Sequence, residues 1–249
     1  CIVLLLKSKG ALQLRFKYFR IYREQLWEMI KIGVPSGLQG CLFSISNVVV
    51  QSSVNSFGEY VMAGNSYSQQ IESVVYQAMN GVSLSALSFV GQNYGAGKYD
   101  RIKKIVLECV LLVTAVGVVL GGLAVLLAKP IVGLITDDAY VVDIAAKRLL
   151  IVCAPYFLCG IMEVYSFTLR GFGKSTSSML INLFGTCVFR LVWIKIMLGI
   201  IDEVYIIYWA YPISWFLAAA GMIIYYEIVI RKLVKKNNAE AVVTEKNEP

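Results

Sequence analysis

The segment 105–128 constrains the fold of this chain more than any other. It consists mostly of valine, leucine, alanine and glycine, and it is at least as long as the roughly 20 residues that a helix needs to cross a bilayer. A surface helix of a soluble protein would instead combine an apolar stripe with a charged face. Gly117, Gly121 and Gly122 lie along the segment and predict close contact with a neighbouring helix. The segment is typical of a membrane-spanning helix.

Comparable apolar stretches recur along the chain, separated by short polar turns. The sequence is 58% hydrophobic and only 16% charged, whereas soluble domains are about 25% charged. We therefore predict an all-α membrane protein, a six-transmembrane-helix bundle. The other five spans are expected at 33–57, 62–90, within 141–170, 176–198 and 205–230.

Three parts of the chain differ in composition. Residues 1–25 begin with an apolar stretch too short to span a membrane and continue into a basic, aromatic-rich segment. We interpret them as the end of a preceding helix plus a basic cytoplasmic linker, so the chain is expected to be a fragment of a larger protein. Residues 26–236 form the predicted six-helix lobe. Residues 237–249 are polar and predict a disordered cytoplasmic tail.

The charges alternate between the two ends of the predicted spans. The formal net charge is +7, but the cations lie at the ends of apolar segments and do not form the clustered basic face that nucleic-acid binding uses. The positive-inside rule then places both ends of the chain in the cytoplasm. The basic side holds the linker, Lys98–Lys104, Arg170, Lys174 and 231–236; the other side holds Glu59, Asp137, Asp138, Asp202 and Glu203, with Lys129 as an exception.

The sequence contains no recognisable pattern for an enzyme site or a cofactor site. The chain has no histidine and no Cys-x-x-Cys pair among its six cysteines, so a metal site or a histidine triad is not expected, and we interpret the cysteines as apolar packing residues. The glycine-rich segment 91–98 departs from a phosphate-binding loop in its spacing, and Tyr99 replaces the required hydroxyl residue. We interpret this segment as a glycine-terminated helix end. No cofactor is predicted.

Three charged residues lie inside predicted spans: Glu72, Glu163 and Arg190. A charge at the bilayer centre costs about 2.5–3.5 kcal/mol, so each needs a partner or water. Glu72 lies roughly 15 Å from the outer turn of its span. Either these residues form an ion pair that holds helices together, or the carboxylates bind a proton or cation in a substrate cavity. By depth, Arg190 is the expected partner of Glu72.

The start of the fourth predicted span also contains charges. Asp143, Lys147 and Arg148 lie in its first turns, where we expect them to contact water. Pro155 follows and predicts a kink.

Polar side chains in the spans are candidates for lining a cavity. Lipid cannot satisfy them, so they are expected to face protein or water. Residues that line a cavity and residues that form hydrogen bonds between helices would both lie on one face of a helix, so the pattern does not distinguish these two roles. The candidates are Gln39 and Asn47 on one face of the first span, Gln69, Tyr76 and Asn80 on the face of Glu72, and Asn182.

Four segments together resemble the multidrug and toxic compound extrusion (MATE) family. They begin at Gly33 (GVPSGLQ), Ile71 (IESVVY), Phe89 (FVGQNYGAGK) and Leu169 (LRGFG), in the order expected of the family's C-terminal half. The resemblance implies a twelve-span exporter of two six-helix lobes. Such an exporter would expel cationic, amphiphilic small molecules across a bacterial plasma membrane by alternating access, in exchange for Na⁺ or H⁺. The N-terminal lobe would be this chain's partner, and Glu72, Glu163 and Arg190 the candidate coupling and substrate-binding residues.

The chain also departs from the family's pattern. Some members have a coupling glutamate in the span that corresponds to 33–57, which holds no acid here. Others have an acid about three turns before the LRG motif, whereas Glu163 lies about two turns before it. Two alternatives follow: a lipid-linked precursor flippase of related fold, favoured if the cavity were rich in arginine and lysine, and a non-transporting structural or receptor-like membrane subunit.

Overall fold

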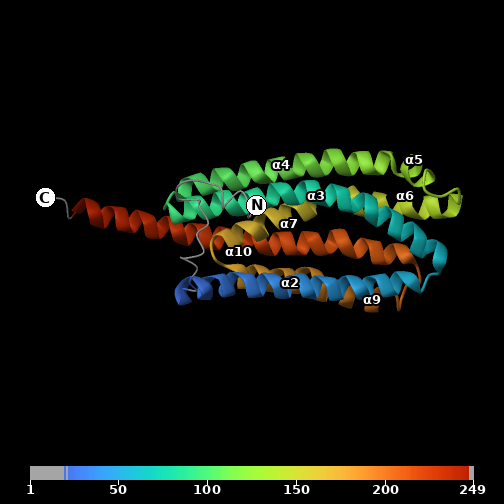
Figure 1. The fold of residues 1–249 in the computed structure, drawn as a ribbon, viewed down its shortest axis with the longest axis horizontal. Coiled ribbons are helices and arrows are strands. Elements are labelled where there is room, and N and C mark those ends of the chain that lie inside the picture. The colour runs from blue at the N-terminus through green and yellow to red at the C-terminus, as the bar shows by residue number, and fades with distance from the viewer. Residues whose placement is uncertain (1–19, 21, 247–249) are drawn as a thin grey trace.

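The computed structural model describes residue 20 and residues 22–246, and within them every regular element is a helix. Figure 1 shows the longer helices lying side by side along one axis. The elements are α2 (Arg23–Asn55), α3 (Glu59–Gly95), α4 (Tyr99–Leu126), α5 (Ala128–Gly133), α6 (Ala139–Cys153), α7 (Phe157–Gly171), α8 (Ser175–Asn182), the π-helix η2 (Leu183–Val188), α9 (Phe189–Met197) and α10 (Val204–Lys246).

These helices make an all-α membrane bundle, as the sequence predicts. Four helical stretches are long and apolar enough to cross a membrane: Arg23–Asn55, Tyr99–Leu126, Ser175–Met197 and Val204–Lys235. The pair α6 and α7 passes the same test as one span bent by 46°. The bend lies at the break that contains Pro155, where a kink is expected. α3 is 37 residues long but is more polar than these spans. It is the sixth long segment of the bundle.

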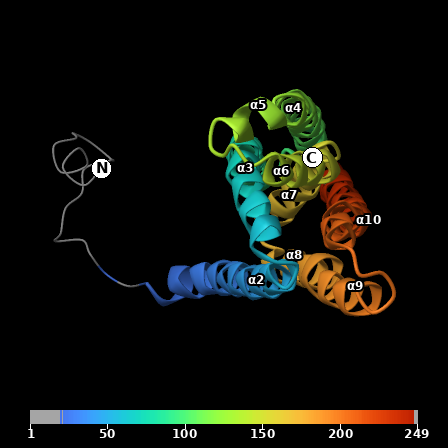
Figure 2. The ribbon, with the colours of Figure 1, turned by 90° about the vertical axis from the view of Figure 1, so that its right-hand side faces the viewer.

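The bundle has two parts when viewed along the helices (Figure 2). α3, α4, α6, α7 and α10 pack around one another, whereas α2 lies beside α8 and α9. Only four residues of α2 are buried: Gln39, Ser46, Val50 and Val54. Most of the apolar surface of α2 is therefore available to lipid or to another part of the protein.

Glycines bring α4 close to the break between α6 and α7. A Cβ added at Gly121 would lie 2.5 Å from the carbonyl oxygen of Cys153, and one at Gly117 would lie 3.0 Å from the Cα of Phe157. The predicted close approach is confirmed at these two positions. A Cβ added at Gly122 would meet no atom within 4 Å, so Gly122 is not part of the contact.

The glycine-rich segment after α3 ends a helix, which confirms the turn interpretation. Gly97 has a φ of +69°, and the N–H groups of Gly97 and Lys98 donate to the carbonyl oxygens of Tyr94 and Asn93 at 3.1 and 2.9 Å. This is a glycine C-cap of the Schellman type. Gly173, with a φ of +72°, ends α7 in the same way.

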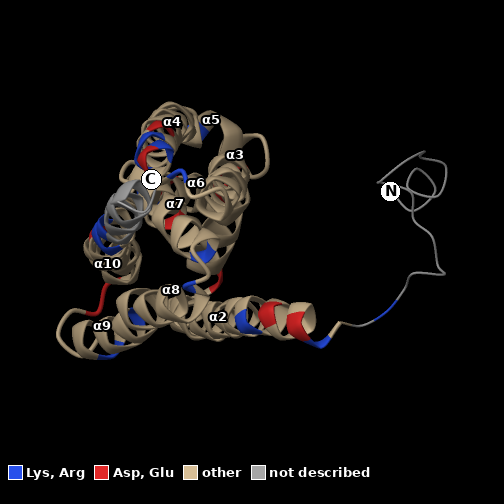
Figure 3. Cartoon of the chain, turned by 90° about the vertical axis from the view of Figure 1, so that its left-hand side faces the viewer, with Lys and Arg blue, Asp and Glu red and all other residues tan. Residues whose placement is uncertain are grey.

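Several basic segments lie at one end of the bundle. Figure 3 looks at the end where α2 begins and α10 leaves the bundle, and it shows lysine and arginine on α2, α4 and α10. The turns that follow α3 and α7 lie at this end too. The predicted sidedness of the loops therefore corresponds to two ends of one bundle.

Several expectations need correction or fall outside the described residues. α10 extends to Lys246 and so overlaps the start of the predicted tail 237–249, whose disorder stays a prediction. Most of the predicted linker, 1–19 and Ile21, lies outside the described residues. Cys109, Cys153, Cys159 and Cys187 are buried free thiols, which agrees with a packing role, but Cys41 is exposed.

Candidate binding cavity

A cavity of about 760 Å³ lies within the bundle. Its walls come mainly from α2, α3 and α7. α10 contributes two residues, and α6, α9 and the α6–α7 break contribute one residue each. The lining combines charged, amide and aromatic side chains. Small-molecule sites in proteins are clefts of about 300–1,000 Å³ with a few placed polar groups, so one drug-sized molecule would fit here.

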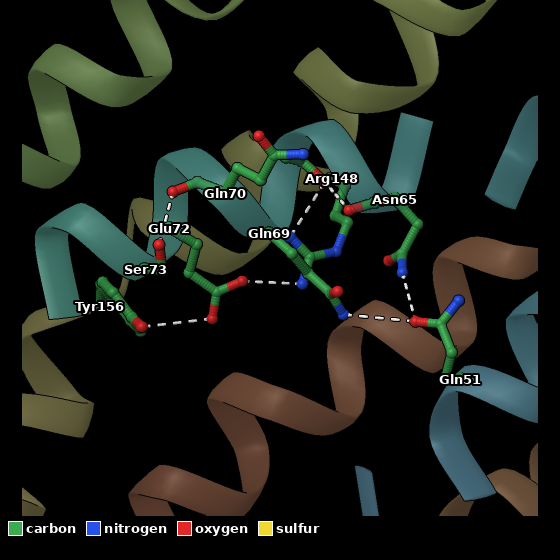
Figure 4. Close-up of polar contacts among 9 residues, drawn as sticks. Gln51, Asn65, Gln69, Gln70, Glu72, Ser73, Arg148 and Tyr156 are labelled. Carbon is green, nitrogen blue, oxygen red and sulfur yellow. Dashed lines mark hydrogen bonds and ion pairs between the residues drawn. The ribbon is translucent and has the colours of Figure 1, made fainter. Parts of the chain in front are cut away.

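Glu72 is held by a buried network on one wall of the cavity (Figure 4). Nη2 of Arg148 donates to Oε2 of Glu72 at 2.7 Å, and the hydroxyl of Tyr156 donates to Oε1 at 3.2 Å. Nη1 of Arg148 also donates to the hydroxyl of Ser68 at 3.0 Å. The side chain of Arg148 is 1% exposed and that of Glu72 is 14% exposed. The two charges neutralise each other and join α3 to α6.

This pairing corrects two expectations. Arg148, not Arg190, is the partner of Glu72, and Arg148 is buried instead of lying in water. Asp143 and Lys147 do form an exposed pair, 2.8 Å apart and one turn apart along the chain. Arg148 is rotated by about 100° from Lys147 around the same helix and so faces the interior.

Amide side chains connect α2 to its neighbours. Nδ2 of Asn65 donates to Oε1 of Gln51 at 2.8 Å, and Nε2 of Gln69 reaches the same oxygen at 3.4 Å. Figure 4 shows both contacts converging on Gln51. Nearer the N-terminal end of α2, Gln39 accepts a 2.9 Å hydrogen bond from Nη2 of Arg170 on α7. α2, which buries few residues, is therefore held across the cavity partly by polar contacts.

Glu163 lines the cavity at a distance from every described cation. No lysine or arginine nitrogen in the described part of the chain lies within 4.0 Å of its carboxylate. Arg170 lies two turns farther along α7, on the same face. Glu163 therefore presents a carboxylate that a bound cation or proton could reach.

Arg190 lines the cavity from α9, directly after the π-helix η2. Its Nε donates to the hydroxyl of Ser214 at 2.9 Å. Its guanidinium lies 4.3 Å from the ring centroid of Tyr211 and 6.0 Å from that of Trp215. The residue is 3% exposed, and no carboxylate within the described ranges lies within 4.0 Å of it.

The cavity brings together most of the residues singled out from the sequence. Two candidates lie outside its lining: Asn80, which is one turn beyond Tyr76 on α3, and Asn182, which is fully buried and donates to the hydroxyl of Ser166 at 3.2 Å. For Asn182 the hydrogen bond between helices is the observed arrangement. The lining includes Glu72, Glu163, Arg190, Gln39, Asn47, Gln69 and Tyr76.

Sequence reasoning missed the aromatic side of the cavity and Arg148. Tyr156, Tyr211, Trp215 and Phe43 line it, but aromatic residues are common throughout the chain and carry no distinguishing pattern. Arg148 did have a signal, because Ile144, Leu149 and Val152 surround it in the sequence. The described residues contain no group of three or more metal-ligating side chains.

Fold and cavity together define the class: an all-α membrane protein with a charged cavity inside its helix bundle. The MatE family model matches residues 35–196, and the chain belongs to this family. It is 27% identical over 168 residues to the probable multidrug resistance protein YoeA of Bacillus subtilis, covering 68% of this chain and 36% of that protein. It is 25% identical over 156 residues to the FAD transporter of Shewanella oneidensis, covering 63% and 34%.

A solved structure has the same fold over nearly the whole chain. The outward-facing conformation of a multidrug resistance MATE family transporter of the MOP superfamily superimposes with a TM-score of 0.84 at 19% sequence identity. The match covers 93% of this chain and 52% of that transporter. The chain therefore spans about half of the solved transporter, and its matches cover about a third of the length of these two curated relatives.

Proposed function

We propose that this chain is the C-terminal lobe of a twelve-helix efflux carrier in a bacterial plasma membrane, with both of its ends in the cytoplasm. The complete carrier would expel amphiphilic small molecules by alternating access, in exchange for Na⁺ or H⁺, and would catalyse no reaction. Membership of the MatE family, the match to half of a solved transporter and the largely unburied α2 support this role. The N-terminal lobe would supply the other half of the pathway.

The cavity of about 760 Å³ is the observation that carries this proposal. Its volume suits one small molecule, and its charged groups lie inside a bundle of membrane-spanning segments. A scaffold would avoid the cost of such groups, so their presence favours a transport role over a purely structural one. Glu163 and the aromatic walls would bind the cationic and apolar parts of a substrate.

Glu163 is the better candidate for the coupling group. Glu72 already accepts hydrogen bonds from Arg148 and Tyr156, so a cation that binds it must first compete with an arginine. The carboxylate of Glu163 has no such partner among the described residues. A cation or proton at Glu163 would displace a cationic substrate from the same place, and this competition is what an antiporter requires. Glu72 would then position the cavity wall.

Reconstituting the full-length carrier in liposomes tests this function. We expect a cationic dye to move against its gradient when a Na⁺ or H⁺ gradient is imposed in the opposite direction, and to stop when the gradient is collapsed by an ionophore. Dye movement that is the same in protein-free liposomes would refute the proposal. Comparing the two gradients separately identifies the coupling ion.

A lipid-linked precursor flippase is the second candidate, because three arginines line the cavity: Arg148, Arg170 and Arg190. Of these three, the sequence predicted only Arg190 as a site residue. One of the three is neutralised by Glu72, however, which weakens this alternative. A liposome assay that follows a fluorescent polyprenyl phosphate between leaflets would distinguish it, since an efflux carrier should leave that lipid's distribution unchanged.

A further inference from the structure

The charges that line the cavity do not balance. The lining holds three arginines and two glutamates, and no aspartate or lysine among the described residues that form it. Glu72 and Arg148 cancel within their 2.7 Å ion pair. Glu163 and Arg170 share one face of α7. Neither Arg170 nor Arg190 has a carboxylate within 4.0 Å in the described part of the chain. Nη2 of Arg170 donates to Gln39, whereas the terminal nitrogens of Arg190 have no protein partner there.

The surroundings of Arg190 leave part of its guanidinium unused. A guanidinium has five N–H donors, and only Nε has a protein partner in the described part of the chain, Ser214. The rings of Tyr211 and Trp215 lie against the guanidinium, 4.3 and 6.0 Å from their centroids, and limit its movement. The terminal nitrogens are thus held ready for a planar anion, and guanidinium binds carboxylates through two parallel hydrogen bonds.

A buried cation without a counter-charge is costly. Arg190 is 3% exposed, and an arginine at such depth in a membrane protein marks a functional site by default. Packing alone does not account for it, because a methionine or leucine could fill the space against Tyr211 and Trp215 without that cost. The arrangement is that of an anion-binding group with one side left open.

We propose that Arg190 binds an acidic group of the substrate, so that the carrier recognises aromatic compounds with both a cationic and an anionic group. This inference deepens, and rests on, the proposed efflux function. The cationic group of such a substrate would approach Glu163, where it competes with the coupling ion. Its carboxylate would approach Arg190, and its aromatic body would lie against Tyr211, Trp215 and Tyr156. A purely cationic compound would leave Arg190 unpaired.

A matched pair of dyes tests this assignment. A rhodamine with a free carboxylate and its methyl ester share the same aromatic cation and differ only in the acidic group. In proteoliposomes of the full-length carrier we expect KM for the carboxylate dye to be at least tenfold lower than for the ester. Arg190→Gln should raise KM for the carboxylate dye about tenfold, the loss of about 1.4 kcal/mol, and change KM for the ester less than twofold.

Two further variants separate charge from shape. Arg190→Lys keeps the charge but loses the planar fork, so its KM for the carboxylate dye should lie between those of the wild type and Arg190→Gln. Arg101→Gln removes an exposed arginine at the start of α4, outside the cavity, and should leave both dyes unaffected. An equal preference for the two dyes in the wild type, or one that Arg190→Gln does not alter, would overturn the proposal and indicate that the other lobe supplies the counter-charge.

Binding measurements keep the outcomes distinct. Fluorescence anisotropy of each dye with the detergent-solubilised carrier reports recognition without transport. If neither dye is transported but the carboxylate dye binds tighter and Arg190→Gln removes that preference, the efflux function fails and the assignment of Arg190 stands. If the Arg190→Gln protein does not fold, the wild-type preference and the Arg190→Lys variant decide.

Discussion

Replacing Glu72 with glutamine tests whether the buried ion pair is structural. The change preserves the shape of the side chain but leaves the charge of Arg148, which is 1% exposed, without a counter-ion. Removing one partner of a buried pair costs about 3–5 kcal/mol. Because Glu72 is 14% exposed toward the cavity, we expect the lower end, about 3 kcal/mol. For a full-length carrier of about twice the length of this chain, that corresponds to a fall in the melting temperature of roughly 3 °C.

The assay measures the melting temperature of the full-length carrier in detergent, with fluorescence-detected size-exclusion chromatography as the readout. The matched control is the double variant Glu72→Gln/Arg148→Met, which removes both charges and should recover most of the lost stability. A Glu72→Gln protein with the wild-type melting temperature and no ion-coupled transport would refute this reasoning. Glu72 would then be the coupling group, and its contact with Arg148 would carry little energy.

Three further substitutions probe packing and polar contacts with the same melting assay. Gly121→Ala places a Cβ 2.5 Å from a carbonyl oxygen of the backbone and should destabilise the protein by about 1–3 kcal/mol. Gly122→Ala, with open space around it, should be neutral or slightly stabilising. Equal effects of the two substitutions would contradict the close packing at Gly121. Asn182→Ala should cost about 1 kcal/mol through its lost bond to Ser166 and leave dye transport unchanged, whereas a transport defect at normal stability would place Asn182 in the pathway.

The membrane-spanning segments were predictable because lipid imposes a simple rule on length and hydropathy. Segment 105–128 corresponds to α4, Tyr99–Leu126, and the bend at Pro155 follows from a residue that cannot continue the helix ladder. The turn at Gly97 was predictable for a similar local reason. Features that depend on one stretch of chain were therefore accessible from the sequence.

The partner of Glu72 was not predictable, because it depends on which helices become neighbours. Depth alone favoured Arg190, but α3 packs against α6 and brings Arg148 to Glu72. Two features hid this arrangement. Asp143 and Lys147 made the start of α6 look exposed, and the π-helix η2 shifts the register just before Arg190, a distortion with no clear sequence signal.

The most direct test of the central claim is gradient-driven dye efflux by the full-length carrier with Glu163→Gln. Glutamine keeps the size of the side chain but cannot bind a proton or act as an anionic ligand. We predict that the variant folds with the wild-type melting temperature, still binds the carboxylate dye through Arg190, and loses its response to imposed Na⁺ and H⁺ gradients. Full gradient-driven efflux by Glu163→Gln would contradict the assignment of the coupling role to Glu163.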